Sequence, residues 1–455
     1  MSELHNDANQ ASSGNDRAQA EPLVEFPPDG QNREVTSGAD LEGLNRAVTT
    51  VAQTAVHPAV FEPTTAAGAN GSRFVSACLR LPVDRTPVWF LRQAGRYMPE
   101  YMAVRRHHSL LDICRTPDIA AEVTITAAER LGVDAAIIFA DLLLPFTPMG
   151  LDFEFVADEG PRILAPIRTA AQAKALRTDR TEELMYVARA IEKVAAHFNP
   201  PRADGDTLGV IGFCGAPFTL ASYMIEGGSS RNYIETKRLM YASQPTASAQ
   251  EDCHPERSAA ESKDLRLGNH ENPDAAALSA ESQAWPILMD KLVTVLADYA
   301  AQQVAAGADV IQVFDSWVGA LTPTDYRAYV LAPTTDLIAR IRALGVPVIY
   351  FGVDTASLLP AMRQTGADVI GLDWRIPLDQ AWSALGHSVA VQGNLDPIAL
   401  FAPPAVLHAR VAEVLAAAAG RPGHIFNLGH GIVPTTPVEA VLAVVHQIKN
   451  SSTTP

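Results

Sequence analysis

The chain has little cysteine, and its cysteines are not spaced for metal binding. Its 455 residues contain four cysteines, at positions 78, 114, 214 and 253. None belongs to a C-x-x-C or H-x-C motif, so the spacing supports neither a zinc site nor a small disulfide framework. Cys253 and His254 are neighbours, but one such pair without further ligands does not predict a metal site. We therefore expect no bound metal.

Long apolar runs and a secretory signal are also missing. No run reaches the roughly 18 apolar residues that a membrane-spanning helix needs. The first ten residues, MSELHNDANQ, have neither a basic start nor an apolar core, so a cytoplasmic location is expected. The formal net charge of -16 and a pI near 5.2 argue against a general nucleic-acid binder and against attraction to an anionic membrane.

Two segments lack hydrophobic periodicity. Residues 1–72 are rich in Ala, Ser, Asn, Gly, Asp and Glu, and they cannot bury enough apolar surface to offset the entropy of ordering. Residues 245–282 are polar, charged and rich in turn formers, and they are far longer than an ordinary connection. We expect a disordered N-terminal extension, a disordered surface insertion and a short tail at 451–455. Residues 73–450 are expected to form a single domain.

Between these segments, apolar runs of β type alternate with stretches of helical spacing, such as Ala120–Leu131 and Ile287–Ala306. A first helix is expected at Phe74–Leu81, and a hairpin at Phe153–Ile163 with its turn at Asp158–Gly160. The alternation predicts an α/β fold with a parallel sheet, and eight runs predict a closed (β/α)8 TIM barrel. An open doubly wound sheet is the alternative, but no G-x-G-x-x-G or P-loop motif supports it. The eight runs are Val88–Leu91, Ala135–Phe139, Leu208–Phe213, Val310–Phe314, Pro347–Phe351, Val369–Leu372, Val389–Val391 and His424–Leu428.

The segment FLRQAGRYMPEY, Phe90 to Tyr101, directly follows the first apolar run. It carries Arg92 and Arg96, four residues apart, and Arg105 follows shortly after. Guanidinium groups bind carboxylates in a two-pronged geometry. Charge alone favours a solvated basic loop. The position on a glycine-containing turn after a buried strand favours an anion site for carboxylates or phosphates.

Four further candidates follow later strands, where barrel proteins place their sites. Asp141 lies among apolar neighbours, so its carboxylate either accepts backbone hydrogen bonds or is functional. Tyr223 lies on a helix and is either a core residue or a site residue. No G-x-S-x-G motif surrounds Ser316, which favours hydrogen bonding over nucleophilic attack. His430 lies between two glycines, where it either caps the backbone or contacts a ligand.

Six motifs together resemble the uroporphyrinogen decarboxylase family of haem biosynthesis. The match runs in order from about Phe74 to Ile448 and omits the extension and the insertion. The resemblance implies a distorted (β/α)8 barrel, usually a homodimer. It implies conversion of the four acetate side chains of uroporphyrinogen III to methyl groups, giving coproporphyrinogen III and four CO2 without a metal or organic cofactor. The motifs are RQAGRYMPEY, IIFADLLLP, GFCGAPFTLASYMIEG, GLDW, QGNLDP and NLGHGI.

The resemblance also implies roles for individual residues. Asp141 would hold the pyrrole N–H groups and stabilise the positive charge that develops on the ring. Arg92 would be the second catalytic residue, although the proton donor stays open between Arg92, a substrate carboxylic acid and a water held by Arg92. The implied substrate contacts are Arg92, Gln93, Ala94, Gly95, Arg96, Arg105, Asp141, Tyr223, Ser316 and His430.

Two other functions are compatible with a barrel of this superfamily. One is a corrinoid- or zinc-dependent methyltransferase, against which the missing H-x-C spacing counts. The other is a non-catalytic tetrapyrrole-binding protein. Against it stands the intact set Arg92, Asp141, Tyr223 and His430.

Overall fold

The computed structural model describes residues 71–156, 160–203, 205–243 and 283–451. Residues 1–70, the centre of the predicted hairpin turn, the predicted insertion 245–282 and residues 452–455 lie outside these ranges. The predictions of a disordered extension and a disordered insertion therefore stay predictions, and so does the interpretation of the Cys253–His254 pair.

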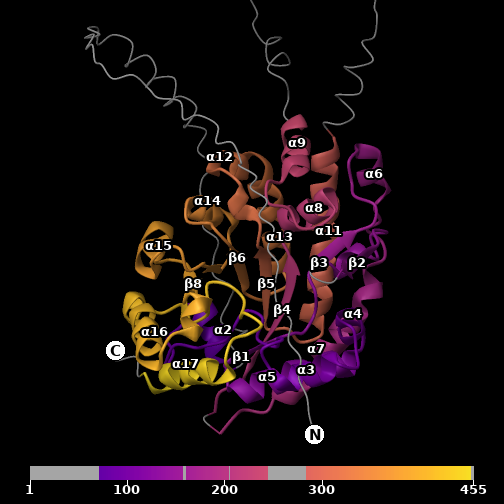
Figure 1. Cartoon of the computed structure of the whole chain (residues 1–455). Helices are drawn as coiled ribbons and strands as arrows, with labels where there is room; N and C mark the ends of the chain where they lie inside the picture. Colours follow the sequence, from indigo (N-terminus) through magenta and orange to yellow (C-terminus); the bar gives the residue numbers. More distant parts are fainter. Residues whose placement is uncertain (1–70, 157–159, 204, 244–282, 452–455) are drawn as a thin grey trace, which may run out of the picture. The chain divides into compact units, whose positions relative to one another are not determined.

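Seven parallel strands form one sheet whose spatial order follows the chain. Neighbouring strands pair in a continuous register: Ile311 of the third strand, for example, faces Gly212 on one side and Val348 on the other. The strands are β1 (Ala135–Ile137), β4 (Gly209–Gly215), β5 (Val310–Asp315), β6 (Val348–Gly352), β7 (Val369–Gly371), β8 (Ala390–Gln392) and β9 (His424–Ile425). Figure 1 shows β4, β5 and β6 at the centre of the fold.

A short bridge joins the two edges of this sheet. Val88 pairs in parallel with Phe426 just after β9, and the Asp134 amide, just before β1, donates to the Val88 carbonyl at 2.8 Å. The predicted strand over Val88–Leu91 is therefore too long, because the Leu91 amide donates to the Asn427 side chain (3.0 Å) in place of a backbone carbonyl. The predicted (β/α)8 barrel is confirmed, in a form in which the eighth position is a bridge.

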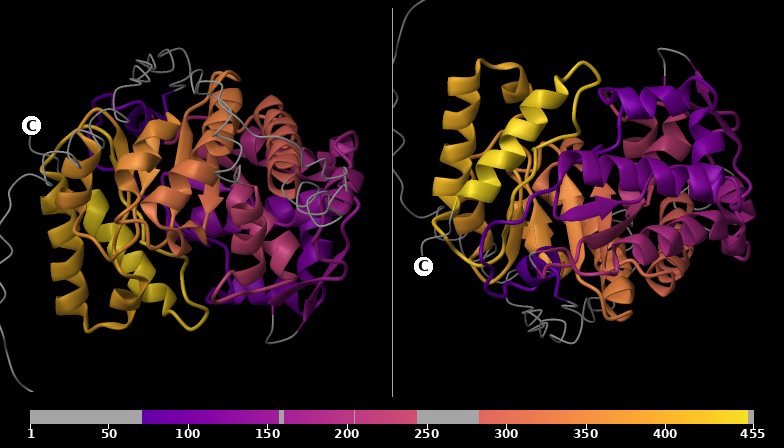
Figure 2. Two further views of the ribbon diagram at one scale, coloured as in Figure 1. Left: turned by 90° about the horizontal axis from the view of Figure 1, so that it is seen from above. Right: turned by 90° about the horizontal axis from the view of Figure 1, so that it is seen from below.

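The predicted helices and the hairpin are present. The helix predicted at Ala120–Leu131 is α5, which begins at Pro117 and ends before Gly132, a left-handed cap with φ 67°. In the hairpin, β2 (Phe153–Val156) pairs with antiparallel β3 (Gly160–Ile163). Helices cover the strands when the fold is seen from above and below (Figure 2). They are α2 (Arg73–Cys78), α3 (Pro99–Arg105), α4 (Leu110–Arg115), α5 (Pro117–Leu131), α6 (Ala170–Ala175), α7 (Met185–Phe198), α8 (Pro217–Glu226), α9 (Ile234–Ala242), α11 (Ala284–Ala305), α12 (Pro323–Asp325), α13 (Leu331–Arg342), α14 (Leu359–Met362), α15 (Leu378–Leu385), α16 (Pro404–Ala418) and α17 (Val438–Asn450). Short 3-10 or π turns are η2 (Leu144–Phe146), η3 (Thr181–Leu184), η5 (Val318–Ala320), η6 (Tyr326–Val330), η7 (Arg363–Thr365) and η8 (Pro397–Phe401).

Hydrogen-bonded amide side chains cross the barrel interior. Trp89 Nε1 donates to Gln392 Oε1 at 2.9 Å, and Gln392 Nε2 donates to Gln312 Oε1 at 3.3 Å. These residues come from the bridge segment, β8 and β5, so they meet across the barrel and are almost fully buried. Large apolar side chains surround them, and buried amides of this kind need such partners because an unpaired one is costly.

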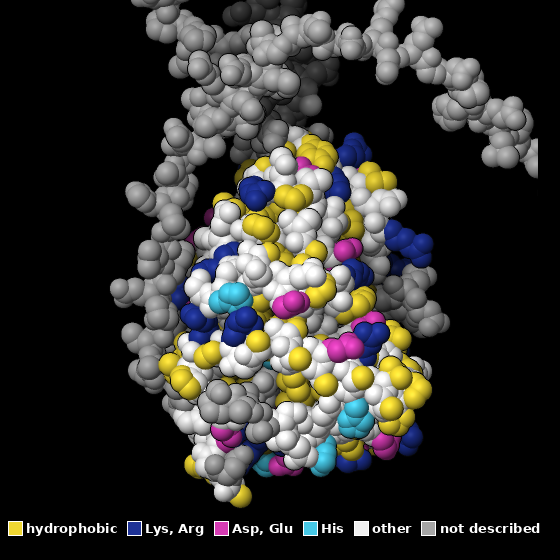
Figure 3. All heavy atoms as spheres, turned by 90° about the vertical axis from the view of Figure 1, so that its left-hand side faces the viewer, with side chains coloured by type: hydrophobic (Ala, Val, Ile, Leu, Met, Phe, Trp, Pro, Cys, Tyr) yellow, Lys and Arg dark blue, Asp and Glu magenta, His cyan; other side chains and the backbone are white. Residues whose placement is uncertain are grey.

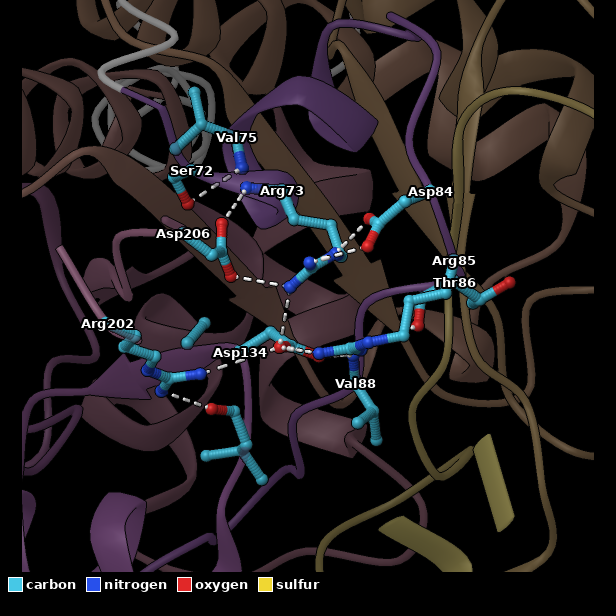
Figure 4. Close-up of polar contacts among 12 residues, drawn as sticks. Ser72, Arg73, Val75, Asp84, Arg85, Thr86, Val88, Asp134, Arg202 and Asp206 are labelled. Carbon is cyan, nitrogen blue, oxygen red and sulfur yellow. Dashed lines mark hydrogen bonds and ion pairs between the residues drawn. The ribbon is translucent and has the colours of Figure 1, made fainter. Parts of the chain in front are cut away.

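An ionic network closes the barrel at the amino ends of its strands (Figure 4). The fully buried carboxylate of Asp134 accepts both terminal nitrogens of Arg85, each at 2.7 Å, and the amide of Val88 at 2.9 Å. Arg73 of α2 lies 3.4 Å from Asp134 and 2.6 Å from Asp206. Because Val88 is also the bridge residue, this network fixes the place where the sheet closes.

The helices of the described ranges do not have the features of a membrane span. There, no helix is both long and apolar enough to cross a bilayer. On the face seen in Figure 3, acidic and basic side chains are interspersed among apolar ones wherever described residues are visible. Such mixing of charges is usual for a protein surface exposed to water.

Candidate functional site

The predicted site residues come after the carboxyl ends of different strands. Arg92 follows the bridge segment, Asp141 follows β1, Tyr223 lies on α8 after β4, Ser316 follows β5 and His430 follows β9. Because parallel strands of a barrel end on one face, these residues share that face although up to 338 residues separate Arg92 from His430 in sequence.

The turn that carries Arg92 is held in an unusual backbone conformation. Arg92 has a φ of 58°, in the left-handed region that few non-glycine residues adopt. Gln93 beside it is buried, and its amide accepts from the Phe90 N–H (3.3 Å) and donates to the Ala135 carbonyl (3.1 Å). The Tyr97 hydroxyl donates to the Gln93 carbonyl at 2.6 Å. The Gln93 side chain and carbonyl are thus both used within the turn, which they stabilise.

Arg92 packs directly on the glycine turn after β9. A Cβ added at Gly431 would lie 2.6 Å from Cγ and 2.9 Å from Nε of Arg92, so only glycine fits beneath this side chain. The Ile432 amide also donates to the Leu91 carbonyl at 3.0 Å. The first and last segments of the site are therefore fitted to each other.

We expect Gly431→Ala to lower kcat/KM for the substrate by about tenfold, because the new methyl group displaces Arg92 from its position. Steady-state kinetics would check this. Gly345→Ala is a control for backbone strain without steric contact, since that glycine has a positive φ of 88° and nothing lies within 4 Å of an added Cβ. Equal kinetic losses in the two variants would contradict the steric explanation.

Asp141 is a carboxylate in a largely apolar setting. Burial raises its pKa, and this effect is opposed by the hydrogen bond from the Leu143 amide (2.9 Å to Oδ1) and by the charge of Arg92. No described residue donates to Oδ2, so that oxygen is open to a ligand. The Asp141 carboxylate therefore combines an available acceptor oxygen with a nearby positive charge.

Tyr223 and His430 present neutral polar groups beside this pair. Burial raises the pKa of Tyr223, and the Asp141 charge raises it further, so the hydroxyl keeps its proton. Burial lowers the pKa of His430, and Arg92 lowers it further, so the imidazole is neutral at pH 7. Arg92 therefore acts electrostatically on Asp141, Tyr223 and His430, which places all four residues together.

The remaining predicted residues lie around this group. Arg96 is exposed, and Arg105 ends α3 with its NH1 donating to the His108 carbonyl at 2.5 Å. Burial raises the pKa of Tyr101, and the charges of Arg105 and Arg96 both act to lower it, so both guanidinium groups lie near the Tyr101 hydroxyl. The backbone of Ala94 and Gly95 is part of the Arg92 turn, and Ser316 is half-buried.

Two residues next to Ser316 had no role in the sequence prediction. Trp317 packs on Tyr223, with ring centroids 3.8 Å apart and planes inclined by 32°. Asp315 is completely buried at the end of β5. The only sequence signal was their place after a strand, which does not show which side chains point inward. Among the described residues, no group of three or more His, Cys, Asp or Glu side chains could hold a metal ion.

Comparison with known proteins adds to this geometry. A family model described as "Uroporphyrinogen decarboxylase (URO-D)" matches residues 70–250 and 275–451. The uroporphyrinogen decarboxylase of Koribacter versatilis is 58% identical over 374 residues, which cover 82% of this chain and 94% of the relative. That of Solibacter usitatus is 48% identical over 378 residues, covering 83% and 97%. Among solved structures, a methyltransferase from Methanosarcina mazei has a TM-score of 0.63 at 18% identity, covering 84% of this chain and 98% of that one. At this identity the likeness shows a shared fold alone.

Proposed function

The chain belongs to the uroporphyrinogen decarboxylase family, and we propose that it converts the four acetate side chains of uroporphyrinogen III to methyl groups. The products are coproporphyrinogen III and four CO2, which makes the protein a carboxy-lyase of porphyrin biosynthesis. The observation that supports this most directly is the joint placement of Arg92, Asp141, Tyr223 and His430 on one barrel face.

The charges of this face suit the substrate. Uroporphyrinogen has eight carboxylates around its rim and four pyrrole N–H donors at its centre. Arg92, Arg96 and Arg105 supply guanidinium groups for the carboxylates, which they bind as forks. The Tyr223 hydroxyl, the Ser316 hydroxyl and the neutral His430 ring orient acetate and propionate groups. Asp141 Oδ2 accepts hydrogen bonds from the pyrrole N–H groups.

The pyrrole ring serves as the electron sink for the reaction. A proton adds to the ring carbon beside the acetate arm, and the ring becomes cationic. The C–C bond to the carboxylate then breaks, CO2 leaves, and the bonding pair neutralises the ring as an exocyclic methylene. A second proton adds to that methylene carbon to complete the methyl group, and the first proton then leaves the ring carbon, which restores the neutral pyrrole. Asp141 stabilises the cation because its carboxylate is already oriented by the Leu143 amide.

The proton comes from a group that can release it near neutral pH. Guanidinium groups hold their protons too tightly to act as acids, and the raised pKa of Tyr223 makes the phenol a poor acid as well. A substrate carboxylic acid or a water bound by Arg92 is the better donor. Arg92 then has a positioning and charge-stabilising role beside Asp141.

We expect Arg92→Lys to lower kcat/KM by about ten- to a hundredfold, although the positive charge is kept. An ammonium group is a point donor and lacks the planar fork that binds a carboxylate through two parallel hydrogen bonds. Arg327 lies on η6 and donates to the Pro323 carbonyl, so Arg327→Lys is the control. Comparing the kinetics of the two variants would separate the loss of fork geometry from a general effect of lysine. Near-normal turnover of Arg92→Lys would remove Arg92 from the mechanism.

An anaerobic assay with uroporphyrinogen III tests the proposed reaction. Products separated by carboxyl count should run from seven to four carboxylates, with matching CO2 release. Binding of the substrate without CO2 would establish a non-catalytic tetrapyrrole-binding protein. Transfer of a methyl group by zinc-loaded protein would instead favour the methyltransferase alternative. For that alternative, the M. mazei structure offers a similar fold and no more.

We also propose a cytoplasmic homodimer. Family resemblance supports both statements, and the acidic composition fits a protein that stays dispersed in water. Light scattering coupled to size-exclusion chromatography would give the mass directly. A mass near the 48.6 kDa of one chain would reject the dimer.

A further inference from the structure

Asp315 is a fully buried carboxylate whose side-chain hydrogen-bond partners in the described part of the chain are hydroxyl groups, and the Thr219 backbone adds a further hydrogen bond. Thr219 Oγ1 donates to Oδ1 at 2.7 Å, and the Tyr350 hydroxyl donates to Oδ2 at 2.8 Å. Neither Lys, Arg nor His forms an ion pair with it within the described ranges. A buried carboxylate with no cation needs such donors, because each oxygen would otherwise lose its hydration without replacement.

The hydroxyl contacts extend behind Asp315 into a helix. Tyr350 lies on β6, and its hydroxyl is 3.2 Å from that of Tyr326. Tyr326 begins η6 (Tyr326–Val330), a turn of π-helix inserted between α12 and α13. Such turns are rare, and they often re-aim a side chain at a functional site. Here the π turn places a second buried hydroxyl behind the first.

In front of Asp315, the same contacts reach the substrate side of the barrel. Thr219 Oγ1 accepts the amide of Trp317 at 3.2 Å while donating to Asp315. The Trp317 ring packs on Tyr223 at 3.8 Å between centroids. Ser316 lies between Asp315 and Trp317 in the sequence, so the contacts of these two neighbours restrain its backbone. The turn of Asp315, Ser316 and Trp317 thus contains one proposed substrate contact, Ser316, and packs on a second, Tyr223.

We propose that Asp315 is a positioning residue for the uroporphyrinogen site. By orienting the hydroxyls of Thr219 and Tyr350, its carboxylate fixes the turn that carries Ser316 and, through Trp317, the ring of Tyr223. The inference rests on the proposed function, since it assigns Ser316 and Tyr223 to the substrate.

The energetic cost of this carboxylate supports a functional role. Burial raises the pKa of Asp315 to about 6, although the hydrogen bonds from Thr219 and Tyr350 lower it. Because the folded-state pKa is raised above the ordinary aspartate value of 3.8, the stability contributed by this group is greatest at low pH and falls as pH rises to about 6. Tyr350 and Tyr326, the titratable groups that face it, keep their protons because burial raises their pKa values. At neutral pH the protein therefore retains a destabilising charge one residue from its site, which is typical of functional positions.

Asp315→Asn reproduces the neutral state of the carboxyl group. An ionised carboxylate only accepts, so both hydroxyls donate to it. A protonated acid or an amide also donates a hydrogen bond, so either the Thr219 or the Tyr350 hydroxyl must become an acceptor. The hydrogen bonds that orient the Ser316 turn then change. We expect Asp315→Asn to lower kcat/KM for uroporphyrinogen III by about tenfold at pH 8, with no fall in melting temperature, since the costly charge is gone.

The pH dependence of kcat/KM distinguishes a positioning role of Asp315 from a purely structural one. Asp141, His430 and the substrate titrate in both proteins, so the ratio of wild-type to Asp315→Asn kcat/KM isolates Asp315. The ratio should approach 1 below about pH 5 and rise to about tenfold above pH 7, with its midpoint near the Asp315 pKa of about 6. A ratio that does not change with pH would overturn the proposal.

A threonine pair provides the matched control. Thr219→Val removes the hydroxyl that joins Asp315 to Trp317, and it should raise KM about tenfold. Thr365, on η7 before β7, has an equally buried hydroxyl, but that hydroxyl donates to the Met362 carbonyl at 2.7 Å. The kinetics of Thr365→Val should therefore match the wild type. Equal kinetic losses in both valine variants, or wild-type kinetics in Asp315→Asn and Thr219→Val, would refute the inference while decarboxylation by the wild type still stands. Failure of the wild type to release CO2 would instead reject the proposed function, and this inference with it.

Discussion

Replacing Asp141 by Asn should lower kcat for uroporphyrinogen decarboxylation by about a hundred- to a thousandfold and change KM only by a few-fold. The amide keeps the size of the side chain and the acceptor for the Leu143 amide, which now donates at 2.9 Å. It removes the negative charge that stabilises the cationic ring, and losing one preorganised group of that kind costs on the order of 3 kcal/mol in the transition state. The loss therefore falls on kcat.

The measurement is an anaerobic assay with products resolved by carboxyl count. Asp112→Asn is the control, because it removes one negative charge from an exposed capping residue that accepts the Ser109 amide. Its kcat should equal that of the wild type. If Asp141→Asn instead gives the complete product series at the normal rate, Asp141 has no part in charge stabilisation.

The acid side of the wild-type pH profile should report the same group. Burial raises the pKa of Asp141, so its active, ionised form is lost at a higher pH than for an exposed aspartate. Activity should fall as pH decreases through this raised pKa. In Asp141→Asn the remaining activity should lack that limb. An unchanged acid limb in the variant would assign it to the substrate carboxylates.

Asp134→Asn should give the largest loss of stability, about 3–5 kcal/mol, with unchanged activity per folded molecule. Asp134 is completely buried, and it accepts both terminal nitrogens of Arg85 at 2.7 Å and the Val88 amide. An amide can accept from only one oxygen, so its NH2 group faces Arg85 and leaves a guanidinium without its partner. Removing one member of a buried ion pair has an effect of this size. Figure 4 shows Arg73, Arg85 and Arg202 directed at this carboxylate.

Urea unfolding followed by far-UV circular dichroism would measure the loss. Asp336→Asn is the control: it breaks an exposed pair with Arg340 (2.9 Å) on α13, and it should change stability by less than about 1 kcal/mol. The network lies at the amino ends of the strands, opposite the site. A selective loss of kcat in folded Asp134→Asn would contradict this separation of stability and activity.

The barrel was predictable because its signal is periodic. Each buried strand of the sheet coincides with an apolar run, and the predicted helix Ile287–Ala306 is α11 (Ala284–Ala305). The first strand was predicted too long for a physical reason. Leu91 is as apolar as a strand residue, but its amide bonds to the Asn427 side chain, and the backbone then turns at Arg92 with positive φ. Local sequence patterns do not show that the Asn427 side chain, 336 residues away, replaces a backbone carbonyl as the hydrogen-bond acceptor for this amide.

The structure brings predicted site residues to one face of the barrel, and their roles in binding and catalysis stay predictions. Asp141 stood out because an unpaired carboxylate among apolar neighbours is costly, and Arg92 because it lies on a glycine-containing turn directly after a buried strand. Gln93 looked like a polar contact, yet its buried amide spans Phe90 and Ala135. The support that Trp317 and Asp315 give to the site depends on which way side chains point at a strand end, and that follows from packing with α8 and β6.

The joining of Val88 to Phe426 has a consequence for protein synthesis. The site needs Arg92 from the beginning of the barrel and Gly431 from its end, and the bridge that aligns them cannot form until Phe426 has left the ribosome. A nascent chain that has emerged only through β8 contains every arginine of the site but no closed barrel. Its two open sheet edges are exposed to other chains during this interval. Barrel closure is therefore a late event in synthesis, and nonsense mutations upstream of the Phe426 codon should leave no partial activity.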